Sequence, residues 1–106
     1  MEKFLYFQNS TSDAMMLSTD MLTEMNVTAD DDLTLSFKGQ FNVGGRERQI
    51  VLSITAHKGK EVMAAITDAV RFQKDPFIVV CDETNNEFLH SAITACESTL
   101  SDVVNL

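Results

Sequence analysis

The sequence has no tryptophan, only one proline and only two cysteines, and no apolar stretch approaches the ~20 residues that a membrane-spanning helix needs. The apolar run between Met1 and Phe7 is too short for a signal-peptide core, and no small-residue cleavage site follows it. We therefore expect a protein that does not insert into a membrane and is made in a reducing cytoplasm.

The two cysteines and two histidines do not form a recognisable metal or redox motif. Cys81 and Cys96 are not in a Cys-x-x-Cys pair, and His57 and His90 are not at zinc-finger spacing. Both cysteines lie in apolar, strand-like contexts, which favours buried, reduced thiols over a disulfide.

Basic residues are also scarce, with 8 Lys and Arg against 16 Asp and Glu, for a formal charge of −8. Nucleic-acid binding requires clustered basic side chains, so this balance argues against it. The acidic residues are spread over the whole chain, which favours solubility or a basic protein partner.

What is present is a chain of 106 residues that is 44% hydrophobic, enough for one modest core. We expect a single domain over residues 1–106. Its first part predicts short strands at Lys3–Gln8 and Ala14–Leu17. N-cap chemistry at Ser18 predicts one or two helical turns through Met25.

The middle of the chain predicts a hairpin followed by a helix. Leu33–Phe37 alternates apolar and polar residues, as a strand with one solvent-exposed face does, and Gln49–Thr55 returns antiparallel to it after a loop over Gly39–Arg48. Lys58–Gln73 carries one apolar stripe, so it predicts a helix that ends before Asp75-Pro76. We expect this stripe to pack on the strands through Val62, Ile66 and Val70 against Ile50, Leu52, Ile54 and Val79.

The last third predicts two further strands. Phe77–Cys81 is apolar without interruption, which is typical of a strand buried on both faces, and Glu87–Glu97 has a longer strand pattern. The apolar tail Leu100–Leu106 either folds back on the domain or reaches a neighbour. The order of elements predicts an α+β fold, with a single antiparallel sheet, flat or curled into a half-barrel, and one helix packed on one face.

The strands Phe4–Phe7 and Phe77–Cys81 are apolar on both faces, and a single helix covers only one side of a sheet. The other side needs a cover, which is either the sheet itself, curled into a barrel or sandwich, or the Met-rich segment 14–25, or a neighbouring subunit. Because the predicted elements offer fewer covers than there are apolar strand faces, we expect self-association or docking on a partner.

Candidate sites have simpler structural interpretations. The acidic turn at 30–32 and the acidic loop at 82–87 offer oxygen ligands for a hard cation, but neither has the EF-hand pattern. His57 and His90 lack the nucleophile motifs that would make either a catalytic base. We therefore assign no catalytic, cofactor-binding or metal-binding residue, and we expect a protein that is not an enzyme.

Four segments resemble small proteins encoded by marine bacteriophages. They are Met1–Phe7, Ile54–Lys58, Phe77–Glu83 and Ser91–Ala95. The resemblance extends over most of the chain. The resemblance implies a phage origin and a virion-associated role such as capsid decoration or cement.

We therefore expect a phage virion structural protein that self-associates as a homo-oligomer or docks on the major capsid protein, without nucleic acid, membrane or cofactor. The alternative is a small acidic binding module that inhibits or modulates a host protein. Such a module would present its carboxylates as one stripe if it mimicked nucleic acid.

Overall fold

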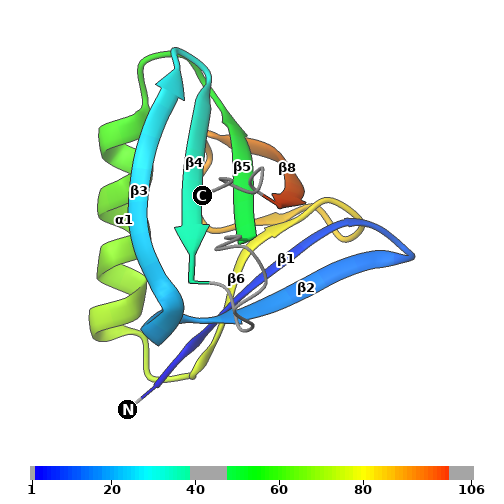
Figure 1. The fold of residues 1–106 in the computed structure, drawn as a ribbon, viewed down its shortest axis with the longest axis vertical. Coiled ribbons are helices and arrows are strands. Elements are labelled where there is room, and N and C mark those ends of the chain that lie inside the picture. Colours follow the sequence, from blue (N-terminus) through cyan, green and yellow to red (C-terminus); the bar gives the residue numbers. More distant parts are fainter. Residues whose placement is uncertain (1, 39–47, 101–106) are drawn as a thin grey trace, which may run out of the picture.

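The part of the chain that the structure describes forms ten short elements, of which one is an α-helix and eight are strands (Figure 1). The structure, a computed structural model, describes the backbone of residues 2–38 and 48–100 and the side chains of residues 2–38 and 48–97. In chain order the elements are β1 (Phe4–Ser10), β2 (Asp13–Ser18), the 3-10 helix η1 (Thr19–Met21), β3 (Leu22–Ala29), β4 (Asp32–Phe37), β5 (Arg48–Ile54), α1 (Gly59–Phe72), β6 (Phe77–Asp82), β7 (Glu87–Phe88) and β8 (Ile93–Leu100).

The strands form two four-stranded sheets, so the α+β class is confirmed, whereas the prediction of a single antiparallel sheet is wrong. Sheet A has the order β2-β1-β6-β7, and sheet B has the order β3-β4-β5-β8. Sheet A is mixed, because β1 runs parallel to β6 and antiparallel to β2. Neither sheet closes into a barrel.

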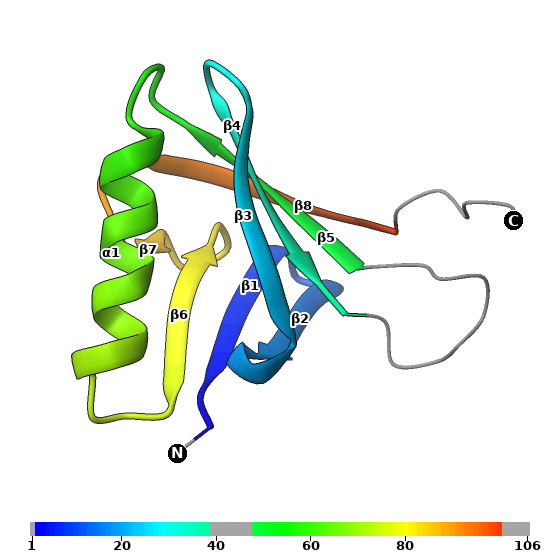
Figure 2. The ribbon, with the colours of Figure 1, turned by 60° about the vertical axis from the view of Figure 1, so that its left-hand side comes forward.

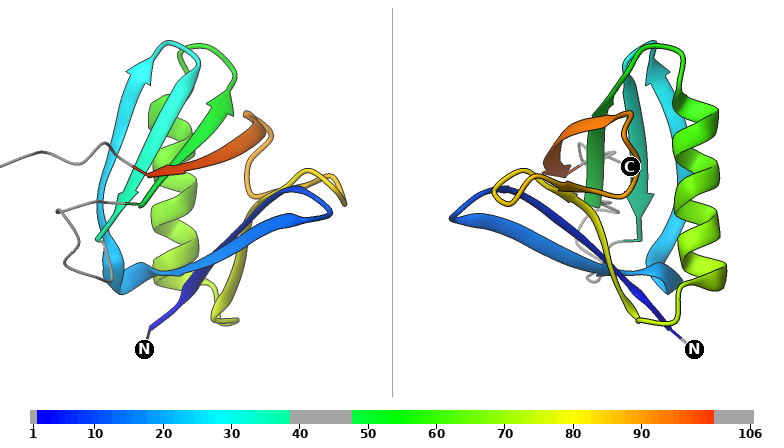
Figure 3. Two further views of the ribbon diagram at one scale, coloured as in Figure 1. Left: turned by 45° about the vertical axis from the view of Figure 1, so that its right-hand side comes forward. Right: turned by 180° about the vertical axis from the view of Figure 1, so that it is seen from behind.

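The core lies between the two sheets, which Figures 2 and 3 show as separate layers. Sheet A contributes Leu5 and Ile78, both fully buried, and sheet B contributes Leu35 and Leu52, also fully buried. These side chains belong to one continuous cluster, so the inner face of each sheet is the cover of the other. A sandwich was one of the covers that the sequence left open, but the pairing of β1 with β6 was not predicted, because the two strands are about seventy residues apart and no local pattern indicates that they pair.

Helix α1 lies along one side of the two layers and closes the core there (Figure 2). Val62 and Ile66 are buried in the core, and the half-buried side chain of Val70 packs against it. The predicted helix and its apolar stripe are therefore confirmed. The expected contact with Val79 is wrong, because Ile78 and Val80 point into the core and Val79 does not belong to it.

The Met-rich segment 14–25 is mostly strand, and the helix predicted after Ser18 is limited to the single turn of η1. The Ser18 hydroxyl accepts a hydrogen bond from the Asp20 backbone N–H at 3.1 Å, as an N-cap should, but only η1 follows. Met25 then lies in β3, paired with Leu35 of β4. The cap was predicted correctly, and pairing with β4 overrides the helical continuation.

Strand β4 has no solvent-exposed face, contrary to the prediction. Thr34 and Ser36 are 7% and 6% exposed, because β4 is an inner strand flanked by β3 and β5. The Thr34 hydroxyl is hydrogen-bonded to that of Thr28 at 3.1 Å, which makes its burial tolerable. The predicted antiparallel pairing of β4 with β5 is confirmed.

The predicted strand Glu87–Glu97 is divided. β7 ends at Phe88, a turn follows over residues 89–92, and β8 joins the other sheet from Ile93 onward. In the turn the Ala92 backbone N–H donates to His90 Nδ1 at 3.0 Å. The predicted hairpin loop from Gly39 onward lies outside the described residues up to 47, as does the apolar tail at 101–106.

Candidate functional site

The side of sheet A that faces away from the core carries two rows of cross-strand neighbours. Tyr6 of β1 is opposite Met16 of β2 and Val79 of β6, while Phe4 is opposite Phe77. Strand alternation places these side chains together, because Leu5, Phe7 and Ile78 point the other way. We call this surface the outer face, and its members are Phe4, Tyr6, Gln8, Ala14, Met16, Ser18, Phe77 and Val79.

The outer face is apolar and partly exposed. Met16 and Phe77 are 51% and 43% exposed, and the ring centroids of Tyr6 and Phe77 are 5.1 Å apart. The Tyr6 hydroxyl donates to Gln8 Oε1 at 2.8 Å, so its polar end has a partner within the face. No member of the outer face is charged, although 23% of the chain is, and the Glu2 carboxylate adjoins the face by accepting a hydrogen bond from the Ser18 hydroxyl.

The covers that the sequence left open can now be compared. Sheet B covers the inner face of sheet A, and segment 14–25 is built into β2, η1 and β3 instead of lying across a sheet. Figure 3 shows no described helix or strand on the far side of sheet A from sheet B. Within the described residues the outer face is therefore left to solvent or to another molecule.

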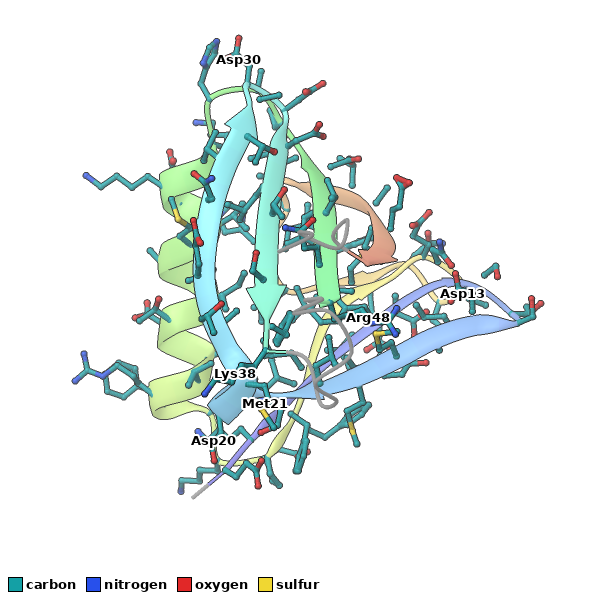
Figure 4. All side chains as sticks on the ribbon, in the orientation of Figure 1. Asp13, Asp20, Met21, Asp30, Lys38 and Arg48 are labelled. Atoms are coloured by element: carbon teal, nitrogen blue, oxygen red, sulfur yellow. The ribbon has the colours of Figure 1, made fainter. Side chains whose placement is uncertain are left out.

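Three of the acidic side chains lie far from one another. Figure 4 places Asp13, Asp20 and Asp30 at three separate ends of the molecule. The Asp30 carbonyl oxygen accepts from the His57 backbone N–H at 3.1 Å in the turn region that precedes α1. A mimic of nucleic acid needs a continuous line of charge, which these three carboxylates do not provide.

A second group of side chains lies inside the fold, between the two sheets. Cys81 comes from β6 of sheet A and Cys96 from β8 of sheet B; they are 0% and 6% exposed, and neither is in a disulfide. A β-bulge in β6, where Tyr6 pairs with Val79 but Phe7 pairs with Cys81, allows both Val80 and Cys81 to be buried.

Glu83 joins this pair from the turn that follows β6. Its Oε2 accepts a hydrogen bond from the Cys96 backbone N–H at 2.9 Å, which points the carboxylate toward the thiols. One ligand atom from each of Cys81, Glu83 and Cys96 lies within 4.8 Å of the other two. We call these three residues the Cys-Glu cluster, and sequence reasoning missed it because the two cysteines belong to different sheets.

The two thiols interact with each other. A hydrogen bond between their side chains raises the pKa of Cys81, and burial and the Cys96 and Glu83 charges raise it further. The same hydrogen bond lowers the pKa of Cys96, while burial and Glu83 act in the opposite direction. Cys81 therefore holds its proton at neutral pH, and Cys96 is the first of the pair to ionise.

The other candidate residues are dispersed. Among the described residues, the Cys-Glu cluster is the one group of three or more His, Cys, Asp or Glu ligand atoms within reach of a single ion. In the acidic loop at 82–87, Asp82 is buried and accepts from the Asn85 backbone and side chain at 3.2 and 2.8 Å. The carboxylates of Asp82 and Glu83, which sequence analysis placed in one acidic loop, therefore have different partners in the structure.

His90 lines a shallow, open cleft beside the start of α1. The same cleft is lined by Glu61, whose carboxylate is 3.6 Å from the Lys58 ammonium. His90 Nδ1 already accepts from a backbone N–H, and neither histidine is in the Cys-Glu cluster. Ser91 lines the same cleft, but within the described part of the chain no hydrogen bond joins His90 to the Ser91 hydroxyl or to the Glu61 carboxylate.

Comparison with protein-family models, with curated proteins and with solved structures finds no match for this chain. In the part of the chain that the structure describes, α1 is too short and too polar to span a bilayer, and it is the one α-helix there.

Proposed function

We propose that this protein is a non-enzymatic phage virion structural protein, a capsid decoration protein whose copies associate through the outer face of sheet A. The observation that carries the proposal is an apolar face without charge on a chain of net charge −8. Exposed apolar patches of this kind mark protein interaction sites more often than the scattered apolar residues of an ordinary surface.

A second copy of the chain is the occupant that this face fits best. Two copies repel each other through their net charge, so they associate most readily through a surface that brings no carboxylates together. None of the eight members of the outer face is a carboxylate, although the Glu2 carboxylate lies at its edge, on the Ser18 hydroxyl. A two-fold axis through the face would set Tyr6, Met16 and Phe77 of one copy against the same residues of the other.

The apolar gain is sufficient for a modest interface. Complete burial of a large apolar side chain contributes about 1.5–3 kcal/mol, so the half-exposed Met16 and Phe77 would contribute about 1 kcal/mol each. A two-fold interface counts each contribution twice. Weak contacts of this size become useful when many copies are held on a symmetric lattice, because avidity multiplies them.

The capsid setting rests on the resemblance to marine bacteriophage proteins, and the self-association rests on the outer face. The two parts therefore need separate tests. For the setting, mass spectrometry of purified particles of the phage that encodes this chain should detect it in high copy number. Its absence from the particles would reject the virion role.

For self-association, the mass of the protein in solution is measured by light scattering for two variants. Met16→Glu places a charge in the middle of the outer face and should yield monomers. Phe72→Glu is the matched control, because Phe72 is 68% exposed but lies on α1. It should associate as the unmodified protein does. A monomeric unmodified protein, or equal masses for the two variants, would reject the proposed interface.

A further inference from the structure

The Cys-Glu cluster has the chemistry of a site for a thiophilic divalent cation. Two cysteine sulfurs and a carboxylate oxygen form a ligand set that suits Zn²⁺, whereas Ca²⁺ and Mg²⁺ prefer oxygen ligands alone. The cluster does not belong to the outer face, so it is independent of the proposed function.

The distances within the cluster are close to those of a metal centre. Because the three ligand atoms all lie within 4.8 Å of one another, a point exists that is no more than about 2.8 Å from each. Zinc lies about 2.3 Å from sulfur and about 2.0–2.2 Å from a carboxylate oxygen. Each ligand atom thus needs to move by less than about 1 Å to complete the site.

One hydrogen bond supports the cluster from its surroundings. The Cys96 backbone N–H holds Glu83 Oε2 at 2.9 Å, which fixes the orientation of the carboxylate before a metal arrives. A small cavity, lined by Asn9 and Asp13 among others, adjoins Cys96, which is one of the three ligand residues.

We infer that Cys81, Glu83 and Cys96 bind a Zn²⁺-like cation that ties β6 of sheet A to β8 of sheet B, and that the metal displaces the protons of both thiols to solvent. Such a bond crosses the core between the two layers, and it acts only in the folded state, where the ligands of the two sheets are close together. Binding therefore raises the melting temperature and makes it dependent on the metal concentration.

The test uses the full chain, purified in reductant and freed of metal by a chelator that is then removed. Titration with Co²⁺ should give a thiolate-to-cobalt charge-transfer band that saturates at one equivalent and disappears when Zn²⁺ is added. Zn²⁺ should raise the melting temperature. A protein without the band and without the thermal shift would overturn the inference.

Two matched variants identify the ligands. Glu83→Gln keeps an oxygen acceptor for the Cys96 N–H, so it should melt cooperatively but bind the metal about tenfold more weakly or worse. Glu87→Gln removes the same charge from an exposed position across the same loop and should bind as the unmodified protein does. Equal affinity in the two variants would also overturn the inference, as would loss of affinity in Glu87→Gln alone.

Discussion

Gly59 is the position at which the close packing of α1 on sheet B is most sharply testable. It is buried at the first residue of α1, and a Cβ built on it would lie 2.5 Å from Val27 Cγ2 and 3.8 Å from Ile54 Cδ1. Carbon atoms prefer a separation of about 3.5–4.0 Å, so Gly59→Ala requires Val27 or the helix to move by about 1 Å.

The magnitude follows from two opposing contributions. Alanine is favoured over glycine within a helix by about 0.5–1 kcal/mol, and less than that at the first position. Overpacking a close contact costs about 1–3 kcal/mol. The clash outweighs the propensity, so Gly59→Ala should lower the free energy of unfolding by about 1–2 kcal/mol.

A double-mutant cycle separates these contributions. Val27→Ala removes the clashing Cγ2 from a side chain that is 44% exposed, so alone it should cost less than about 1 kcal/mol. In that background Gly59→Ala should become neutral or stabilising. Urea unfolding followed by circular dichroism measures all four proteins. The reasoning fails if Gly59→Ala has the same effect in both backgrounds.

Three further predictions concern the core, the β6–β7 turn and the thiols. Val62 is fully buried, so Val62→Asp should abolish the cooperative thermal transition by burying an unpaired charge, and a melt close to that of the unmodified protein would contradict this. Asp82→Ala removes the acceptor of two Asn85 hydrogen bonds and should cost about 1–3 kcal/mol in urea unfolding, whereas an unchanged midpoint would contradict it. Titration of the protein denatured in chelator without oxidant should return two free thiols, from Cys81 and Cys96, and a value of zero would indicate a disulfide.

The parts of the fold that local patterns specify were predictable. The apolar stripe of α1 and the stop at Pro76 act over a few residues, and the helix forms as Gly59–Phe72. The strands β4 and β5 are neighbours along the chain and pair antiparallel as expected. Strands that are apolar on both faces likewise indicated that the sheet has a second face in need of a cover. The exposed Met16 and Phe77 lie on that face, which is the outer face of sheet A.

The parts that depend on distant pairing were not predictable. The parallel pairing of β1 with β6 creates sheet A, and no sequence pattern near Phe4 or Phe77 predicts this pairing. The Cys-Glu cluster has the same origin, because Cys81 and Cys96 meet only when sheet A packs on sheet B. Thr34, by contrast, looks solvent-exposed from alternation alone, and only its place in an inner strand explains its burial.

The most direct test of the proposed self-association is a cross-link that reports which faces meet. With Met16→Cys, a short bifunctional maleimide should join two copies into a covalent dimer, because the outer faces are opposed across a two-fold axis. Phe72→Cys, on α1, should remain a monomer under the same treatment. A dimer from Phe72→Cys but not from Met16→Cys would place the contact elsewhere and contradict the account.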